Sequence, residues 1–286
     1  MDDLNIKLIE CPRDAMQGWK SFISTEKKIA YINQLLKVGF DTIDFGSFVS
    51  PKAIPQMADT KEVIEQLAMT NTKTKLLAIV ANVRGAAEAS VYDKINYFGF
   101  PFSISPTFQM RNTNSTIEKS LENVKDIKNI CDKNNKELVI YISMAFGNPY
   151  NDLYNEDIVV EWIDKITAEG IAIISLADTV GIAEPAQVSS VTKKVIAAFP
   201  EIEVGVHLHS ANKKRQQKLN AAFQEGCRRF DGTLKGVGGC PMAKNELVGN
   251  MDSEFMITYF QNLGYCKEID KDALAKSIEM AEEIFI

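Results

Sequence analysis

The sequence predicts an α/β protein in which residues 1–286 form one (β/α)₈ TIM barrel with an additional C-terminal helix. Three observations lead to this fold class. Short apolar runs of strand type alternate with longer segments of helical spacing, and eight such units fit the length. The chain contains no linker, low-complexity tract or charge block that would divide it into domains. The first expected turn reads CPRDAMQG and lacks the glycines of the main rival, a doubly wound open sheet.

The expected strands are short apolar runs, most of them bounded by Gly, Pro, Asn or Asp. In a barrel of this type the strands are parallel, so all of their carboxyl ends meet at one rim. The runs span residues 6–9, 42–45, 75–81, 94–98, 137–142, 171–177, 203–208 and 229–234.

The expected helices have apolar residues at positions i, i+3 and i+4, which gives each helix one face to pack on the barrel. In residues 25–40, Thr25 can cap the start of the helix and Gly39 closes its end. Ser115 and Glu118 are expected to form a capping box at the start of the next long helix. The same pattern fills residues 115–134, 155–170, 184–200, 213–226 and, as the additional C-terminal helix, 272–286.

The bulk composition is that of an ordinary globular protein, with 45% hydrophobic and 24% charged residues. The net charge of −6 argues against a nucleic-acid partner. The start, MDDLNIKLIE, predicts neither a secretory signal nor a transit peptide, and no apolar run approaches the roughly 20 residues that cross a bilayer. The five cysteines are scattered and odd in number, so disulfides are not expected. We therefore expect a cytoplasmic protein without a membrane partner.

Polar side chains recur at the carboxyl ends of the expected strands, where the active sites of such barrels are built. One rim of the barrel is therefore expected to carry the chemistry. The residues are Arg13 and Asp14 after the first strand, Asp44 and Ser47 after the second, Ser143 after the fifth, Asp178 and Thr179 after the sixth, His207 and His209 at the seventh, and Cys240 and Asn250 after the eighth.

The two histidines of the chain, His207 and His209, stand two positions apart at the end of an expected strand. Side chains alternate along a strand, so both imidazoles should project to the same side. A lone histidine is more often an ordinary core residue, but this pair favours ligands for a divalent metal. Asp14 can add a carboxylate and Asn250 a carbonyl oxygen, and this mixed oxygen and nitrogen set suits Mg²⁺ or Mn²⁺. For Asp14 alone, a salt bridge to Arg13 or a helix cap is the competing interpretation.

Cys240 lies in the glycine-rich loop GVGGCP after the eighth expected strand. A thiol on such a loop can close over a site and donate a proton there, whereas a buried apolar role is the usual alternative for a cysteine. Its position favours the functional interpretation. Cys11, placed inside the first strand, and Cys131 and Cys227, placed in helical segments, are interpreted as core residues.

Taken together, several motifs resemble the 3-hydroxy-3-methylglutaryl-CoA lyase family of the DRE-TIM metallolyase superfamily. They are ECPRDAMQ, the segment from ISTEKK to SFVSPKAIPQMAD, SLADTVGIAEP, VHLH and KGVGGCPMAKNELVGN. The resemblance runs from about Lys7 to about Gly264, and the combination of motifs is specific although each one alone is weak.

The resemblance implies a metal-dependent retro-Claisen cleavage of 3-hydroxy-3-methylglutaryl-CoA, or a close acyl-CoA, to acetyl-CoA and acetoacetate. It implies that Arg13 holds the thioester oxygen and the developing enolate, and that Cys240 transfers a proton. It also implies a homodimer or a higher homo-oligomer. The implied metal ligands are Asp14, His207, His209 and Asn250. The implied catalytic residues are Arg13, Asp14, Asp44, His207 and Cys240. The implied substrate-binding residues are Arg13, Gln17, Ser47, Ser143 and Thr179.

Three features depart from the family pattern, and one of them is the segment between Cys240 and Asn250, which is one residue longer than expected. Asp44 stands where the family usually has glutamate, and Ser210 stands where an aspartate usually follows the histidine pair. A basic cluster, Lys213 to Arg215, follows and could meet CoA phosphates or form a solvated helix face. Two alternatives therefore stay open: another enzyme of the superfamily that acts on a 2-oxoacid, as an aldolase or a synthase, and a degenerate barrel without catalysis.

Overall fold

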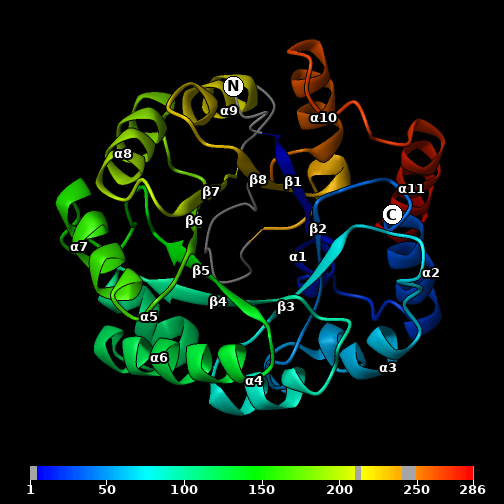
Figure 1. Ribbon diagram of the computed structural model, residues 1–286, viewed down its shortest axis with the longest axis horizontal. Coiled ribbons are helices and arrows are strands. Elements are labelled where there is room, and N and C mark those ends of the chain that lie inside the picture. Colours follow the sequence, from blue (N-terminus) through cyan, green and yellow to red (C-terminus); the bar gives the residue numbers. More distant parts are fainter. Residues whose placement is uncertain (1–4, 210–213, 240–248, 286) are drawn as a thin grey trace.

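The computed structural model describes residues 5–209, 214–239 and 249–285, and in this part of the chain parallel strands close into a barrel (Figure 1). Each strand pairs with its neighbour in sequence, and β1 closes the ring against β8, with Ile9 opposite Asp231. The TIM barrel predicted from the sequence is therefore confirmed. The strands are β1 (Lys7–Glu10), β2 (Thr42–Ser47), β3 (Lys75–Ile79), β4 (Tyr97–Ser103), β5 (Glu137–Ser143), β6 (Ile173–Ala177), β7 (Glu203–His207) and β8 (Arg229–Gly232).

The helices surround the barrel on its outside (Figure 1). The additional C-terminal helix is present as α11 and packs against α2, where Phe285 lies 6.3 Å from the ring of Tyr31. The helices are α1 (Pro12–Gln17), α2 (Thr25–Leu35), α3 (Thr60–Glu65), α4 (Val83–Ser90), α5 (Pro106–Thr113), α6 (Ile117–Lys133), α7 (Glu156–Thr167), α8 (Pro185–Ala198), α9 (Arg215–Gln224), α10 (Ser253–Asn262) and α11 (Lys271–Ile284), with short 3₁₀ turns η1 (Pro55–Met57) and η2 (Leu234–Gly236). None of these described helices is long and apolar enough to span a bilayer.

Two of the expected helix caps were wrong by one residue. Ser24, not Thr25, accepts the backbone hydrogen bond at the start of α2, and Thr116, not Ser115, does so at the start of α6. In both places two neighbouring hydroxyl residues could cap. The backbone chooses between them, because only the residue in the extended conformation aims its side-chain oxygen at the free N–H groups.

The fourth strand was also misplaced, since the expected run 94–98 only touches the start of β4. The strand continues through Gly99 and Pro101, two residue types that usually interrupt strands. Gly99 is required there because a Cβ would lie 2.6 Å from Cδ1 of Ile79 and 3.0 Å from the ring of Tyr141. The crowded barrel interior, not local propensity, selects this glycine.

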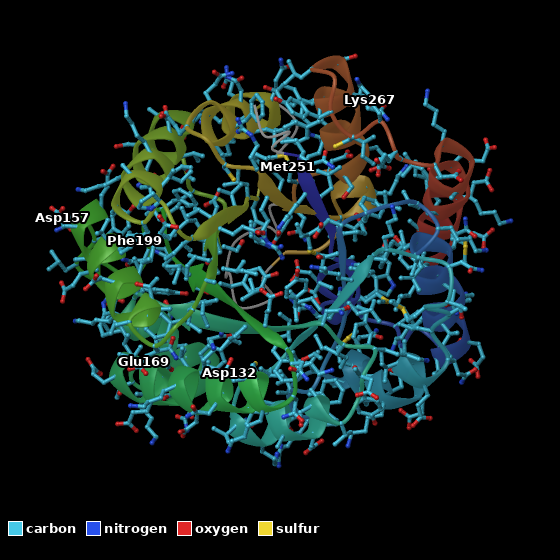
Figure 2. All side chains as sticks on the ribbon, in the orientation of Figure 1. Asp132, Asp157, Glu169, Phe199, Met251 and Lys267 are labelled. Atoms are coloured by element: carbon cyan, nitrogen blue, oxygen red, sulfur yellow. The ribbon has the colours of Figure 1, made fainter. Side chains whose placement is uncertain are left out.

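The interior of the barrel is divided into an apolar and a polar half. Side chains fill the interior as well as the space beneath the helices (Figure 2). A separate apolar cluster lies on the β3–β6 side and consists of Leu77, Ile79, Tyr97, Val139, Tyr141 and Ile173. On the other side, β8, β1, the first βα turn and β2 carry buried charged residues, and β7 adds the partly buried His207. The polar half therefore positions the candidate site.

Candidate metal centre and active site

The site begins at the first βα turn, where Cys11 follows β1 and α1 starts at once with Pro12. Proline suits this first helical position because its fixed φ fits the helix and its missing N–H would have no partner there. Arg13 and Asp14 follow within the first turn and are both buried, at 8% and 7% exposed. The short turn thus places a cation and an anion side by side at the barrel rim.

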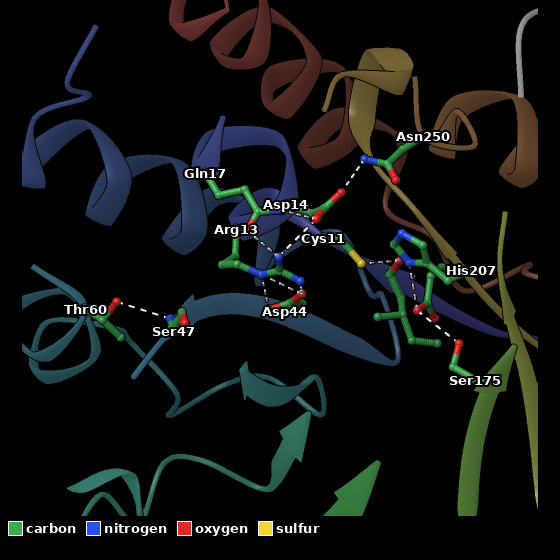
Figure 3. A network of polar contacts seen from close by, with 12 residues as sticks. Cys11, Arg13, Asp14, Gln17, Asp44, Ser47, Thr60, Ser175, His207 and Asn250 are labelled. Atoms are coloured by element: carbon green, nitrogen blue, oxygen red, sulfur yellow. Dashed lines mark hydrogen bonds and ion pairs between the residues drawn. The ribbon is translucent and has the colours of Figure 1, made fainter. Parts of the chain in front are cut away.

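Arg13 is held by three neighbouring side chains (Figure 3). Its Nε donates to Asp44 at 3.0 Å and its Nη2 donates to the same carboxylate at 2.5 Å. Its Nη1 donates to Asp14 Oδ1 and to Gln17 Oε1, each at 3.0 Å. A guanidinium has five N–H donors, so this arrangement leaves one Nη2 hydrogen for a further acceptor.

The charges around Arg13 fix its protonation. Burial opposes its positive charge, but the carboxylates of Asp44 and Asp14 outweigh burial and raise the pKa of Arg13. Burial raises the pKa of Asp44 to about 6, against the opposing pull of Arg13, so Asp44 is ionised at neutral pH. Burial also opposes the charge of Asp14, yet the positive charges around it, Arg13 first, lower its pKa.

His207 and His209 project to the same side of the chain, and their ring centroids are 5.3 Å apart. One ligand atom from each of Asp14, His207 and His209 lies within 4.8 Å of the other two. Lys218, itself buried, donates to the carbonyl of His209 at 2.7 Å and to Asp178 at 2.8 Å, which anchors the end of β7. The structure therefore brings together the three residues that the sequence proposed as ligands from β7 and the first turn.

Asn250 completes this arrangement from the segment after β8. Its Nδ2 donates to Asp14 Oδ2 at 2.7 Å (Figure 3) and to the carbonyl of Val237 at 3.0 Å. Its Oδ1 and the Nε2 of His209 are buried, and neither has a hydrogen-bond partner among the described residues. Two such atoms beside a carboxylate are what a bound cation would satisfy, so the residues present fit a divalent ion. Oxygen and imidazole nitrogen donors suit Mg²⁺ or Mn²⁺.

Asp231 on β8 is a site residue that the sequence reasoning missed. Its side chain is fully buried, and its Oδ2 lies 3.2 Å from His207 Nδ1 and 3.5 Å from Ser175 Oγ. This contact leaves Nε2 of His207 for an ion. Burial alone would lower the pKa of His207, but the hydrogen bond and charge of Asp231 raise it. Burial and the charge of His207 lower the pKa of His209 to about 4.

The remaining expected site residues make local contacts at the same rim. Thr179 Oγ1 accepts from the backbone N–H of Met144 at 2.9 Å, directly after Ser143. Ser47 follows a bulge in β2, and its Oγ accepts from the N–H of Val49 at 3.2 Å. Within the described residues, these three hydroxyl groups make no hydrogen bond to the carboxylates or the histidines of the site, so their roles stay predictions.

Two other predictions concern cysteine and the basic cluster. Cys240, Ser210 and Lys213 lie outside the described residues. Lys214 forms an ion pair with Glu184 at 2.6 Å and Arg215 pairs with Asp252 at 2.8 Å, so both cations already have carboxylate partners. Cys11 is buried as expected, but it follows β1 instead of lying within it.

Comparison with known proteins shows which family this chain resembles. The sequence model of the HMGL-like family matches residues 5–280. The chain is 32% identical to the hydroxymethylglutaryl-CoA lyase of Bacillus subtilis, over 95% of this chain and 90% of that protein. It is 29% identical to the (R)-citramalyl-CoA lyase of Chloroflexus aurantiacus, over 92% of this chain and 85% of that protein.

Solved structures agree with these relatives. The crystal structure of the B. subtilis HMG-CoA lyase superposes with a TM-score of 0.91 at 31% identity, covering 98% of this chain and 93% of that one. An HMG-CoA lyase from Acinetobacter baumannii, in complex with coenzyme A and 3-methylmalate, superposes with a TM-score of 0.90 at 29% identity, covering 99% and 92%.

Proposed function

This chain belongs to the HMGL-like family of lyases, and from that premise we propose that it cleaves 3-hydroxy-3-methylglutaryl-CoA to acetyl-CoA and acetoacetate with the aid of Mg²⁺ or Mn²⁺. The observation that carries the proposal is the convergence of two groups at one rim. One is a buried arginine with an N–H to spare, and the other is the set of Asp14, His207, His209 and Asn250.

The reaction breaks the C2–C3 bond of the acyl group. The C3 hydroxyl loses its proton and becomes the ketone of acetoacetate, while the bond electrons pass to C2 and form the enolate of acetyl-CoA. Protonation of C2 then completes acetyl-CoA. A divalent cation supplies Lewis-acid chemistry here, because it makes the C3 hydroxyl easier to deprotonate. Asp14, His207, His209 and Asn250 would hold that cation.

Arg13 is proposed to bind the thioester oxygen with its remaining Nη2 hydrogen. Negative charge develops on this oxygen as the enolate forms, so a donor that is already oriented stabilises the transition state more than the substrate. Asp44 holds the guanidinium through two nitrogens and fixes its plane. Gln17 supports the same group from α1. Cys240 is proposed as the proton donor to C2, on the strength of its GGCP motif.

A second substrate is favoured by specific observations. One relative is named (R)-citramalyl-CoA lyase, and one structural neighbour was solved with 3-methylmalate. Asp44 is also one methylene shorter than the glutamate that the family usually carries there. The same bond cleavage in citramalyl-CoA would yield acetyl-CoA and pyruvate by atom balance, so the two activities are separable by their products.

The test supplies the purified protein with Mg²⁺ or Mn²⁺ and with each thioester in turn. We expect acetyl-CoA together with acetoacetate from the first thioester. Pyruvate release with no acetoacetate would move the assignment to citramalyl-CoA, and condensation of acetyl-CoA with a 2-oxoacid would move it to a synthase.

A thermal measurement tests the metal requirement separately. Mn²⁺ should raise the melting temperature of the wild-type protein but not that of His207→Ala, because a ligand that binds only the folded state stabilises it. Stable Mn²⁺ binding without cleavage of either thioester would favour the non-catalytic barrel.

A further inference from the structure

The imidazole of His207 has a second nitrogen, Nδ1, that the candidate metal centre does not use. This nitrogen lies 3.2 Å from Asp231 Oδ2. One ligand atom from each of Cys11, His207 and Asp231 lies within 4.8 Å of the other two. Figure 3 shows the sulfur of Cys11 pointing toward the space beside His207.

Cys11 and Asp231 are buried, the side chain of His207 is 12% exposed, and the group has bonding capacity to spare. The thiol of Cys11 has one weak contact, 3.8 Å to the carbonyl of Ile9. Asp231 Oδ1 is buried, and within the part of the chain that the structure describes it has no hydrogen-bond partner. The hydroxyl of Tyr141 is also buried without a hydrogen-bond partner among the described residues, and its ring lies edge-on to His207 with the ring centroids 6.0 Å apart. Buried polar atoms without protein partners need a water molecule or an ion to satisfy them, and a thiol beside a carboxylate and an imidazole favours an ion.

We propose that Cys11, His207 and Asp231 form a second metal site that binds a thiophilic divalent cation such as Zn²⁺ or Cd²⁺. A tetrahedral ion with Zn–N and Zn–O bonds of about 2.0–2.1 Å separates those two ligands by about 3.3 Å, close to the distance between Nδ1 and Oδ2. A thiolate is a soft ligand that selects Zn²⁺ or Cd²⁺ over Mg²⁺. The thiol proton, and any proton on Nδ1, passes to solvent when the ion binds.

The two sites share His207, which has consequences for the first. An ion bound to Nδ1 replaces the hydrogen bond between Nδ1 and Asp231. That hydrogen bond orients the ring of His207 toward Asp14 and His209. Zn²⁺ or Cd²⁺ would therefore compete with Mg²⁺ or Mn²⁺ by occupying a different place, not by simple substitution. This inference concerns the geometry of the apoprotein and does not depend on the proposed cleavage reaction.

A cadmium titration of the metal-free full-length protein tests the site, because thiolate coordination gives Cd²⁺ an ultraviolet charge-transfer band. We expect the band in the wild type, in His209→Ala, in Cys240→Ala and in the remote control Cys131→Ala. We expect its loss in Cys11→Ala. Because even a partner behind a ligand contributes about 10- to 100-fold, removal of this ligand should weaken Cd²⁺ binding by at least about tenfold. A band that survives in Cys11→Ala, or that disappears in Cys240→Ala alone, would overturn the assignment.

A second measurement uses the wild type and does not depend on any variant folding. Crystals soaked in Cd²⁺ should show an anomalous peak between Cys11 Sγ and His207 Nδ1. Cadmium density found only between Asp14 and His209 would refute a separate thiophilic site.

Discussion

Replacement of Asp231 by asparagine should weaken Mn²⁺ binding at the candidate metal centre of Asp14, His207, His209 and Asn250, although Asp231 is not expected to touch that ion. Asparagine has the same shape and can still accept a hydrogen bond from Nδ1 of His207, but it carries no charge. The carboxylate that fixes the ring and increases its basicity is lost, and such partners behind a ligand typically contribute 10- to 100-fold in metal affinity.

The structure places this variant at the lower end of that range. The bond from Nδ1 to Asp231 is 3.2 Å, longer than the roughly 2.7–2.9 Å typical of a charge-assisted bond. We therefore expect Asp231→Asn to bind Mn²⁺ about tenfold more weakly, which is about 1.4 kcal/mol. Asp231→Ala also leaves Nδ1 without its acceptor and should lie nearer the hundredfold limit.

The same variant should change how Mn²⁺ binding depends on pH. Asp231 raises the pKa of His207, and a protonated imidazole cannot ligate, so affinity in the wild type falls as pH drops through that raised pKa. Removal of the negative charge lowers the pKa of His207. The loss of affinity in Asp231→Asn should therefore move to lower pH.

Calorimetric titration with Mn²⁺ at several pH values measures both effects. Ser175→Ala is the matched control, because the hydroxyl of Ser175 meets the same carboxylate at 3.5 Å but makes no hydrogen bond to His207. Equal Mn²⁺ affinity in Asp231→Asn and wild type across the pH series would refute the positioning role.

Three further predictions follow from other contacts. Arg13→Lys should lower kcat more than it changes KM in steady-state assays, because an ammonium cannot keep the planar fork that Asp44 holds. Gly238→Ala should weaken Mn²⁺ binding in calorimetry, since a Cβ there lies 2.8 Å from Asn250 Nδ2; Gly18→Ala, with nothing within 4 Å, should not. Burial raises the pKa of Glu10 to about 8, so between pH 4.5 and 8 the folded state keeps a proton that the unfolded state has lost. The free energy of unfolding should therefore fall as pH rises through this range, by up to about 1.4 kcal/mol per pH unit. Between pH 5 and 8, the melting temperature of the Glu10→Gln variant should change less with pH than that of the wild type.

The barrel could be predicted because the alternation of strands and helices is visible in short stretches of the sequence. Each strand and each helix buries its own apolar pattern, and eight repetitions leave few other architectures. The errors occurred where tertiary packing overrides local preference. β4 runs through Gly99 and Pro101 because the interior admits no Cβ at residue 99. Neighbouring hydroxyl residues at the starts of α2 and α6 gave two equal choices for a cap.

The candidate site was predictable for a different reason. His207 and His209 share a side because side chains alternate, and Asp14 approaches them because the ring closes β1 against β8. Asp231 could not be found in this way. It faces His207 because the two residues are register partners of β7 and β8, and the apolar pattern of either strand does not encode that pairing.

The charges in the polar half of the barrel explain why a divalent ion suits this place. Three buried carboxylates, Asp14, Asp44 and Asp231, share this half of the barrel with two buried guanidinium groups, Arg13 and Arg229, while Glu203, the ion-pair partner of Arg229, is itself paired with Lys7. One negative charge is therefore left over among these groups, and unbalanced charge in a low-dielectric interior is costly. A divalent cation would turn this remainder into one positive charge. That charge would then suit an acyl-CoA whose acyl end carries a free carboxylate, because the carboxylate neutralises it.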